Sequence, residues 1–223
     1  MSPDTPPKGP AGESPRLWRK IGIASAIMMG SIFLSRVMGL IREMVIAGVA
    51  GADTAVDAYR VAFVVPEILN HILASGFLSV TFIPIFSGYL AEKRDDEGWH
   101  VFSMILTVFG AFLLVLVLVA EIFAPSLIGL LAPGRTDPVF LAMAVRMTRI
   151  ILPAQFFFFA GGLLMAVQFA REQFFIPALA PLVYNLGIIL GGVLLAAFCG
   201  MEGFAWGVLG GSLVGNFAIQ IWG

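Results

Sequence analysis

The sequence has little of what most catalytic and metal sites are built from. It contains one cysteine, Cys199, and two histidines, His71 and His100, so no internal disulfide can form and the redox compartment stays open. The histidines lie far apart, without the neighbouring Cys, Asp or Glu residues of a metal site. The sequence shows no nucleophile paired with a base and no glycine-rich phosphate loop. These absences argue against an enzyme and predict that the chain binds no metal and no cofactor.

Charge is scarce as well. Only 12% of the residues are charged, whereas soluble domains typically have about 25%. The net charge of −1 and the lack of a long basic run argue against nucleic acid as a partner. By contrast, 59% of the residues are hydrophobic and the mean hydropathy is +0.96. This composition indicates an integral membrane protein surrounded by membrane lipids.

The first long apolar stretch, residues 21–50, carries charges at membrane depth. Arg36, Arg42 and Glu43 lie inside it, and an ionised side chain near the centre of a bilayer costs on the order of 3 kcal/mol. Arg36 and Glu43 are two helical turns apart and share a face, while Arg42 is turned about a quarter of the way round from Glu43. Two interpretations stay open. The charges line a cationic cavity with its own carboxylate, or they form a structural ion pair near a helix end.

The segment before this stretch has a different composition. Residues 1–17 are rich in Pro, Gly and Ser, which predicts a disordered tail. Arg16, Arg19 and Lys20 precede the apolar run, and the positive-inside bias then places the tail in the cytoplasm. The run is too long and too charged for the core of a signal peptide, so we expect an uncleaved first helix. Residues 18–223 are expected to form one transmembrane domain.

Further apolar segments follow at spacings that suit membrane helices of about 20 residues. We therefore expect an all-α, polytopic membrane protein with about six transmembrane helices. Their predicted ranges are 21–50, 54–90, 101–131, 140–169, 176–198 and 203–223. The second is too long for one straight span, and Pro66 and Gly76 are the expected positions of a kink or break. Cations gather in alternate loops, which predicts that both termini are cytoplasmic.

The second segment carries further polar residues. Asp57 and Arg60 are about one turn apart and are expected to pair with each other. Glu67, Asn70 and His71 follow and form a polar face in the middle of the span. This face is expected to point toward the charges of the first helix.

Whether a cavity exists depends on the fourth segment, where Arg146 and Arg149 form another cationic face. If the faces converge, they enclose a cavity for an anionic or phosphate-bearing substrate, which the planar donor fork of arginine grips well. If the arginines extend separately to the membrane interfaces, no such cavity forms. The aromatic run 156–159 is expected to face lipid rather than to form a binding box.

Small residues repeat at every fourth position in the last two segments. This spacing lets helix backbones approach closely, and helix packing is its expected meaning. The residues are Gly187, Gly191, Gly207, Gly211 and Gly215.

Several motifs resemble those of the MurJ (MviN) family of lipid II flippases, from about Trp18 to the end of the chain. The matching segments are 35–43 (SRVMGLIRE), 55–63 (AVDAYRVAF), 74–79 (ASGFLS), 82–84 (FIP), 132–134 (APG) and 177–181 (PALAP) with Asn185. The resemblance implies the fold of the multidrug/oligosaccharidyl-lipid/polysaccharide exporter superfamily, in which two lobes rock around a central cavity. It implies transport of the undecaprenyl-pyrophosphate-linked peptidoglycan precursor across the bacterial cytoplasmic (inner) membrane.

The resemblance also carries the expected substrate-binding set. Arg36, Arg42, Glu43 and Asp57 match positions that the family uses for its cationic cavity and its outer gate. The polar face of the second segment adds two further candidates. These are Asn70 and His71.

Three departures from the family pattern reduce the charge expected in the cavity. Glu43 stands where the family usually has Asp, Asn70 and His71 stand where it has one or two arginines, and Ser75 replaces a glutamate. Two alternatives therefore stay open beside lipid II transport. One is a flippase for another isoprenoid-linked oligosaccharide, and the other is a membrane scaffold that does not transport.

Length is a further departure. Family members carry about fourteen helices in two lobes, and alternating access needs a second repeat against which the first can move. The chain is therefore expected to be the N-terminal lobe alone, either as a fragment of a longer protein or with a partner lobe on another chain.

Overall fold

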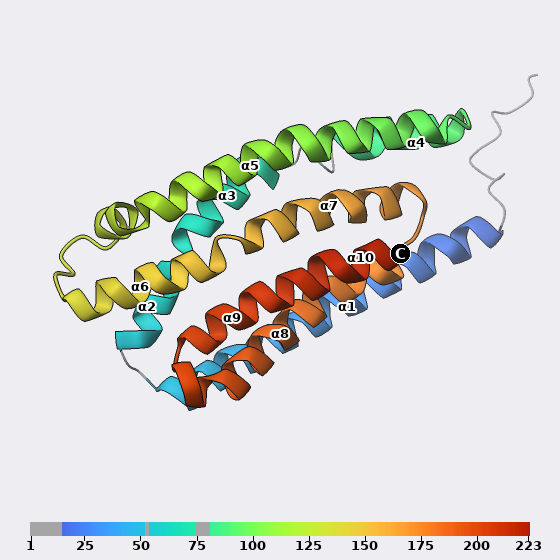
Figure 1. The fold of residues 1–223 in the computed structure, drawn as a ribbon. Helices are drawn as coiled ribbons and strands as arrows, with labels where there is room; N and C mark the ends of the chain where they lie inside the picture. Colours follow the sequence, from blue (N-terminus) through green and yellow to red (C-terminus); the bar gives the residue numbers. More distant parts are fainter. Residues whose placement is uncertain (1–14, 52–53, 75–80) are drawn as a thin grey trace, which may run out of the picture.

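The computed structural model describes residues 15–51, 54–74 and 81–223, and every regular element in these ranges is helical. The helices form an elongated bundle (Figure 1). Their bounds are α1 Pro15–Ala50, α2 Thr54–Ala62, α3 Val64–Ala74, α4 Ile83–Ala91, α5 Asp95–Leu131, α6 Pro138–Ile151, α7 Ala154–Ala170, α8 Phe175–Cys199, α9 Glu202–Gly211, the π-helix η2 Ser212–Ala218 and α10 Ile219–Trp222. Residues 1–14 of the predicted tail and the expected break at Gly76 lie outside the described residues.

Five helical stretches in the described part of the chain are long and apolar enough to cross a membrane. They are Gly22–Val49, Asp95–Leu131, Pro138–Ala170, Phe175–Cys199 and Glu202–Trp222. The second predicted span, 54–90, is instead divided among α2, α3 and α4, whose lengths are 9, 11 and 9 residues. The prediction of an all-helical, polytopic membrane protein is therefore confirmed, with the second span divided into three short helices.

Proline explains the first division of that span. Pro66 has no backbone N–H to donate to the carbonyl of Ala62, which ends α2. The hydroxyl Oγ1 of Thr148, on α6, lies 3.4 Å from this carbonyl oxygen. Ala62 and Thr148 are both fully buried, so the contact joins α2 to α6 inside the bundle.

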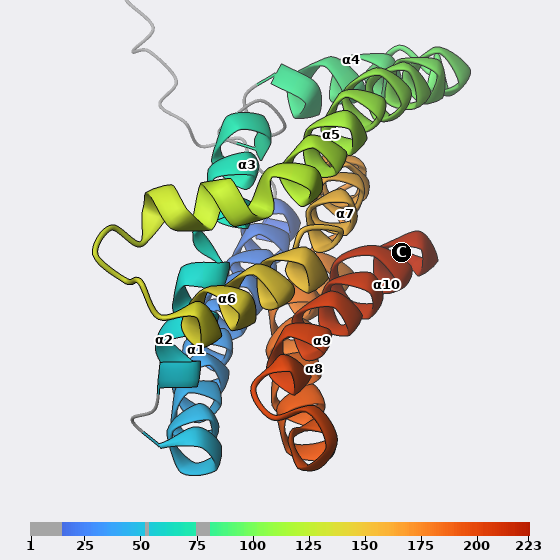
Figure 2. The ribbon, with the colours of Figure 1, turned by 60° about the vertical axis from the view of Figure 1, so that its left-hand side comes forward.

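The fourth predicted span is also divided, because Pro153 separates α6 from α7. The chain passes from Ile151 to Ala154 through a short turn, in which the N–H of Gln155 donates to the carbonyl of Leu152 at 3.1 Å. Pro153 cannot donate a helical hydrogen bond of its own. The turn changes the direction of the chain and brings the start of α7 next to the middle of the bundle (Figure 2).

Helix α8 packs between α1 and α9, as both views show (Figures 1 and 2). The contact between α8 and α9 is made by glycine backbones. A Cβ atom on Gly191 would lie 2.4 Å from the Cα of Gly207, and one on Gly187 would lie 2.5 Å from the Cα of Gly211. Both distances are shorter than any real side chain allows, so the prediction that these glycines serve close helix packing is confirmed.

Candidate functional site

A cavity of about 420 Å³ lies where α1, α2, α3 and α6 to α9 come together. Its volume lies within the range of small-molecule sites, about 300 to 1,000 Å³. Six non-aromatic polar side chains line it. They are Arg42, Glu43, Arg60, Glu67, Asn70 and Gln155. The cavity therefore combines two cations and two carboxylates in a wall that is otherwise apolar and aromatic.

Arg42 is the best-anchored charge in this cavity. Its Nη2 lies 2.9 Å from Glu43 Oε1, and its Nη1 donates to Asn185 Oδ1 on α8 at 3.2 Å. The amide nitrogen of Asn185 donates in turn to the carbonyl of Pro181 at 2.8 Å, which fixes the orientation of its amide group. The Arg42 side chain is 28% exposed, and its Nε is buried without a hydrogen-bond partner among the described residues. Arg42 is thus held in place, while part of its side chain stays accessible to a ligand in the cavity.

The structure brings together only half of the expected substrate-binding set. Arg42, Glu43 and Asn70 line the cavity, whereas Arg36, Asp57 and His71 do not. The other three side chains lie elsewhere on the bundle. Arg36 is exposed on α1, Asp57 faces Arg135, and the His71 ring nitrogen Nδ1 lies 2.9 Å from the Glu67 carbonyl of its own helix.

The ion pairs of α1 and α2 differ in one respect from the expected ones. The predicted pairing of Asp57 with Arg60 is wrong, because Asp57 instead pairs at 2.8 Å with Arg135, in the loop between α5 and α6. Arg60 lines the cavity. Glu43 pairs with its neighbour Arg42, so the carboxylate of α1 stays beside the anchored arginine.

The arginines of the fourth predicted span do not converge on the cavity. Arg146 Nε lies 2.6 Å from Glu202 Oε1 at the start of α9. Arg149 Nε donates to the backbone carbonyl of Glu121 at 3.1 Å. Pro125 lacks the N–H that would otherwise bind this carbonyl within α5. Both arginines therefore stabilise helix contacts rather than enlarge a cationic site.

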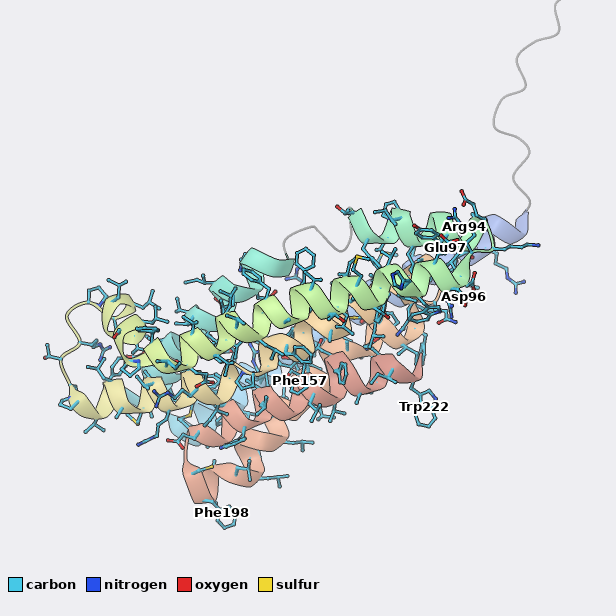
Figure 3. The ribbon with its side chains drawn as sticks, turned by 45° about the horizontal axis from the view of Figure 1, so that its top comes forward. Arg94, Asp96, Glu97, Phe157, Phe198 and Trp222 are labelled. Atoms are coloured by element: carbon cyan, nitrogen blue, oxygen red, sulfur yellow. The ribbon has the colours of Figure 1, made fainter. Side chains whose placement is uncertain are left out.

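Sequence reasoning missed part of the cavity wall. The aromatic run 156–159 was expected to face lipid, but Phe159 is only 4% exposed and Phe158 lines the cavity. The Phe158 ring packs edge to face on Tyr184, with 5.2 Å between ring centroids. Figure 3 shows the neighbouring Phe157 within the bundle, where it packs against Phe217 of η2. The signal that could have found this wall is Gln155, a polar residue directly before the run.

Charges also gather at the opposite end of α5 from the Arg135 loop. Arg94 binds Glu92 and Glu97, and Figure 3 shows Arg94 beside Glu97 and Asp96. The hydrogen bonds that Arg94 donates to Glu97 and to Glu92 raise the pKa of Arg94 above its ordinary value, so this side chain keeps its positive charge. Arg171, in the next loop on this side, lies 4.0 Å from Asp95.

Among the described residues, no group of His, Cys, Asp and Glu could hold a metal ion.

A family model described as "Lipid II flippase MurJ" matches residues 46–222. The chain belongs to the MurJ family. A probable lipid II flippase MurJ of Buchnera aphidicola subsp. Acyrthosiphon pisum is 31% identical over 184 residues, which cover 81% of this chain and 36% of that protein. The lipid II flippase MurJ of Burkholderia cenocepacia is 32% identical over 195 residues, covering 86% and 38%. The family resemblance expected from the motifs is thus confirmed.

The fold agrees with a solved MurJ structure. A lipid II flippase MurJ in an inward closed conformation superposes with a TM-score of 0.72 at 28% identity. The match covers 86% of this chain and 40% of that one. The chain spans about two fifths of the length of the MurJ relatives that it matches.

Proposed function

We propose that residues 18–223 form the N-terminal lobe of a flippase that moves lipid II across the bacterial cytoplasmic membrane by alternating access. The observation that carries this proposal is Arg42. It lies within a membrane-length helix, lines a cavity and is anchored by Asn185. An anchored guanidinium at this depth suits the pyrophosphate of a lipid-linked sugar, because arginine binds phosphate oxygens through two parallel donors.

The substrate-binding set of this proposal is Arg36, Arg42, Glu43, Asp57, Asn70 and His71. Only some of these residues line the cavity in this conformation, and a transporter exposes different faces as its lobes rock. Arg36 and His71 are exposed on α1 and α3, where a second lobe could bring them to the substrate path. The Asp57 to Arg135 pair would act at the outer end. In this proposal the chain is a transporter component and catalyses no covalent reaction.

A second lobe is the partner that this proposal needs. Alternating access requires two bundles that move against each other, and the MurJ relatives are more than twice as long as the match to this chain. The C-terminal lobe would come from the same polypeptide or from a partner chain.

The test uses the two-lobed protein in bacterial cells depleted of their own lipid II flippase. Arg42→Ala should abolish growth, while the protein stays folded and inserted. Arg42→Lys should also impair growth, because a point charge cannot reproduce the bidentate contact. Arg146→Ala is the matched control, since Arg146 pairs with Glu202 away from the cavity, and it should support growth. Full rescue by Arg42→Ala at normal expression would instead favour a structural ion pair between Arg42 and Glu43.

A further inference from the structure

The two sides of the cavity differ in charge. Helices α1, α2 and α3 supply every charged residue of its lining. These residues are Arg42, Glu43, Arg60 and Glu67. Helices α7 and α8 supply Gln155, Phe158 and Tyr184 and no charge. A ligand that fills the cavity therefore meets ionic groups from α1, α2 and α3 and neutral polar and aromatic groups from α7 and α8.

The buried side-chain amide oxygen of Gln155, on α7, lacks a hydrogen-bond donor among the described residues. The residue is only 5% exposed, and its Oε1 is buried without a hydrogen-bond donor among the described residues. A buried amide oxygen without a donor is costly, and nearly all such atoms in folded proteins have a partner. Gln155 lines the cavity, and a half-turn of its amide group would present this oxygen to a ligand that supplies the donor.

The aromatic residues next to Gln155 restrict the class of ligand. Phe158 follows it by about one turn on α7, and Tyr184 packs edge to face against Phe158 with their planes at 75°. Aromatic rings beside an uncharged acceptor suit a sugar, whose C–H faces pack on rings while its hydroxyl or amide groups donate hydrogen bonds. A bare phosphate offers neither an apolar face nor, when fully ionised, a donor.

We propose that the α7 to α8 side of this cavity is a carbohydrate subsite, in which Gln155 Oε1 accepts a hydrogen bond from a hydroxyl or amide N–H of the sugar. The Phe158 and Tyr184 rings pack on the sugar, and Arg42 of α1 binds the pyrophosphate. The subsite rests on the proposed function, because it assigns the sugar of the same lipid-linked substrate to one side of the cavity.

The test compares two lipids that differ only in the sugar-bearing headgroup. Lipid II and undecaprenyl pyrophosphate are titrated against the two-lobed protein in nanodiscs, and the readout is the ratio of their dissociation constants. Gln155→Met keeps the length of the side chain and removes the acceptor, so it should lower the affinity for lipid II about five- to tenfold. The affinity for undecaprenyl pyrophosphate should stay unchanged. Gln155→Glu keeps an acceptor oxygen at the same reach and should preserve the ratio.

A control on the same helix separates recognition from packing. Gln168 is 3% exposed on α7, donates to Gln220 and does not line the cavity. Gln168→Met should leave the ratio unchanged even if it lowers stability. An unchanged ratio in Gln155→Met, with both lipids still bound, would overturn the subsite and leave the proposed function standing. Failure of the unsubstituted protein to bind either lipid would overturn both.

Discussion

Arg149 Nε on α6 lies 3.1 Å from the backbone carbonyl oxygen of Glu121 on α5. The proline four residues further along α5, Pro125, cannot donate to that carbonyl. The guanidinium of Arg149 thus supplies the hydrogen bond that the Glu121 carbonyl cannot receive from Pro125. Within a membrane this replacement matters, because water is not available to satisfy a free carbonyl.

This relationship predicts a specific coupling between the two positions. Arg149→Met should lower the free energy of unfolding by about 1 to 2 kcal/mol, because it leaves the Glu121 carbonyl without a donor and removes the ion pair of 3.9 Å between Arg149 Nε and Glu121 Oε2. In a Pro125→Ala background the loss should be smaller, since the substituted alanine would supply the missing backbone N–H. A double-mutant cycle measured by denaturant unfolding in mixed micelles gives the coupling. Arg146→Met is the control, and its cost should not depend on position 125.

A second prediction concerns the contact between α8 and α9. Gly191→Ala should disrupt this contact and lower the unfolding midpoint strongly, because the new methyl group would meet the Gly207 backbone at 2.4 Å. Gly210→Ala is the matched control on α9, since a Cβ there meets nothing within 4 Å. It should be neutral or stabilise by about 0.5 to 1 kcal/mol through helix propensity. Equal behaviour of the two variants in thermal unfolding would mean that the close glycine contact is not important for stability.

The sequence predicts the helices well and the cavity only in part, for a physical reason. Long apolar segments and glycines at every fourth residue are local signals, and both lead to the observed helices and to the packing of α8 on α9. Arg42 also stands out locally, because a charge at membrane depth is rare. Which charges share a cavity depends on contacts between distant segments. Nothing near Arg149 in the sequence indicates that it donates to the Glu121 carbonyl, which Pro125 leaves without a backbone donor.

The aromatic residues of the cavity wall are also hard to predict from the sequence. Phenylalanines in a membrane protein can face lipid or the interior, and hydropathy does not distinguish the two. Phe158 lies in the first turns of α7, shortly after the turn at Pro153, and lines the cavity.

The orientation of the chain in the membrane gives a third prediction. Arg94 and Arg171 lie in loops at the same end of the bundle, and the positive-inside bias places that end in the cytoplasm. In a Cys199→Ser background, Asp96→Cys should react with a membrane-impermeant maleimide only after the cytoplasmic side is opened. Thr136→Cys should react from the outside of intact cells. The reverse pattern would invert the topology and place the N-terminal tail outside.

The last prediction asks whether the 223-residue chain transports by itself. Large apolar side chains are exposed toward both ends of its bundle, and Figure 3 shows Phe198 and Trp222 pointing away from the helices. They are 87% and 91% exposed, and α1 likewise has large exposed apolar residues along much of its length. Some of these faces are suited to lipid, but a rocking mechanism also needs one face that packs against a second bundle.

We therefore expect the chain to insert into vesicles without moving lipid II, and transport to appear when a C-terminal MurJ lobe is co-reconstituted. Transport is measured as the accessibility of labelled lipid II to a reagent outside the vesicles. Arg42→Ala in the two-lobed assembly is the matched control and should return the signal to that of the lone chain. Robust movement of lipid by the purified chain alone would contradict the prediction, and it would mean that two copies of this chain supply both lobes. A mixture of active chain with excess Arg42→Ala chain would then lose activity in proportion to the mixed pairs, because each pair would contain only one intact cavity.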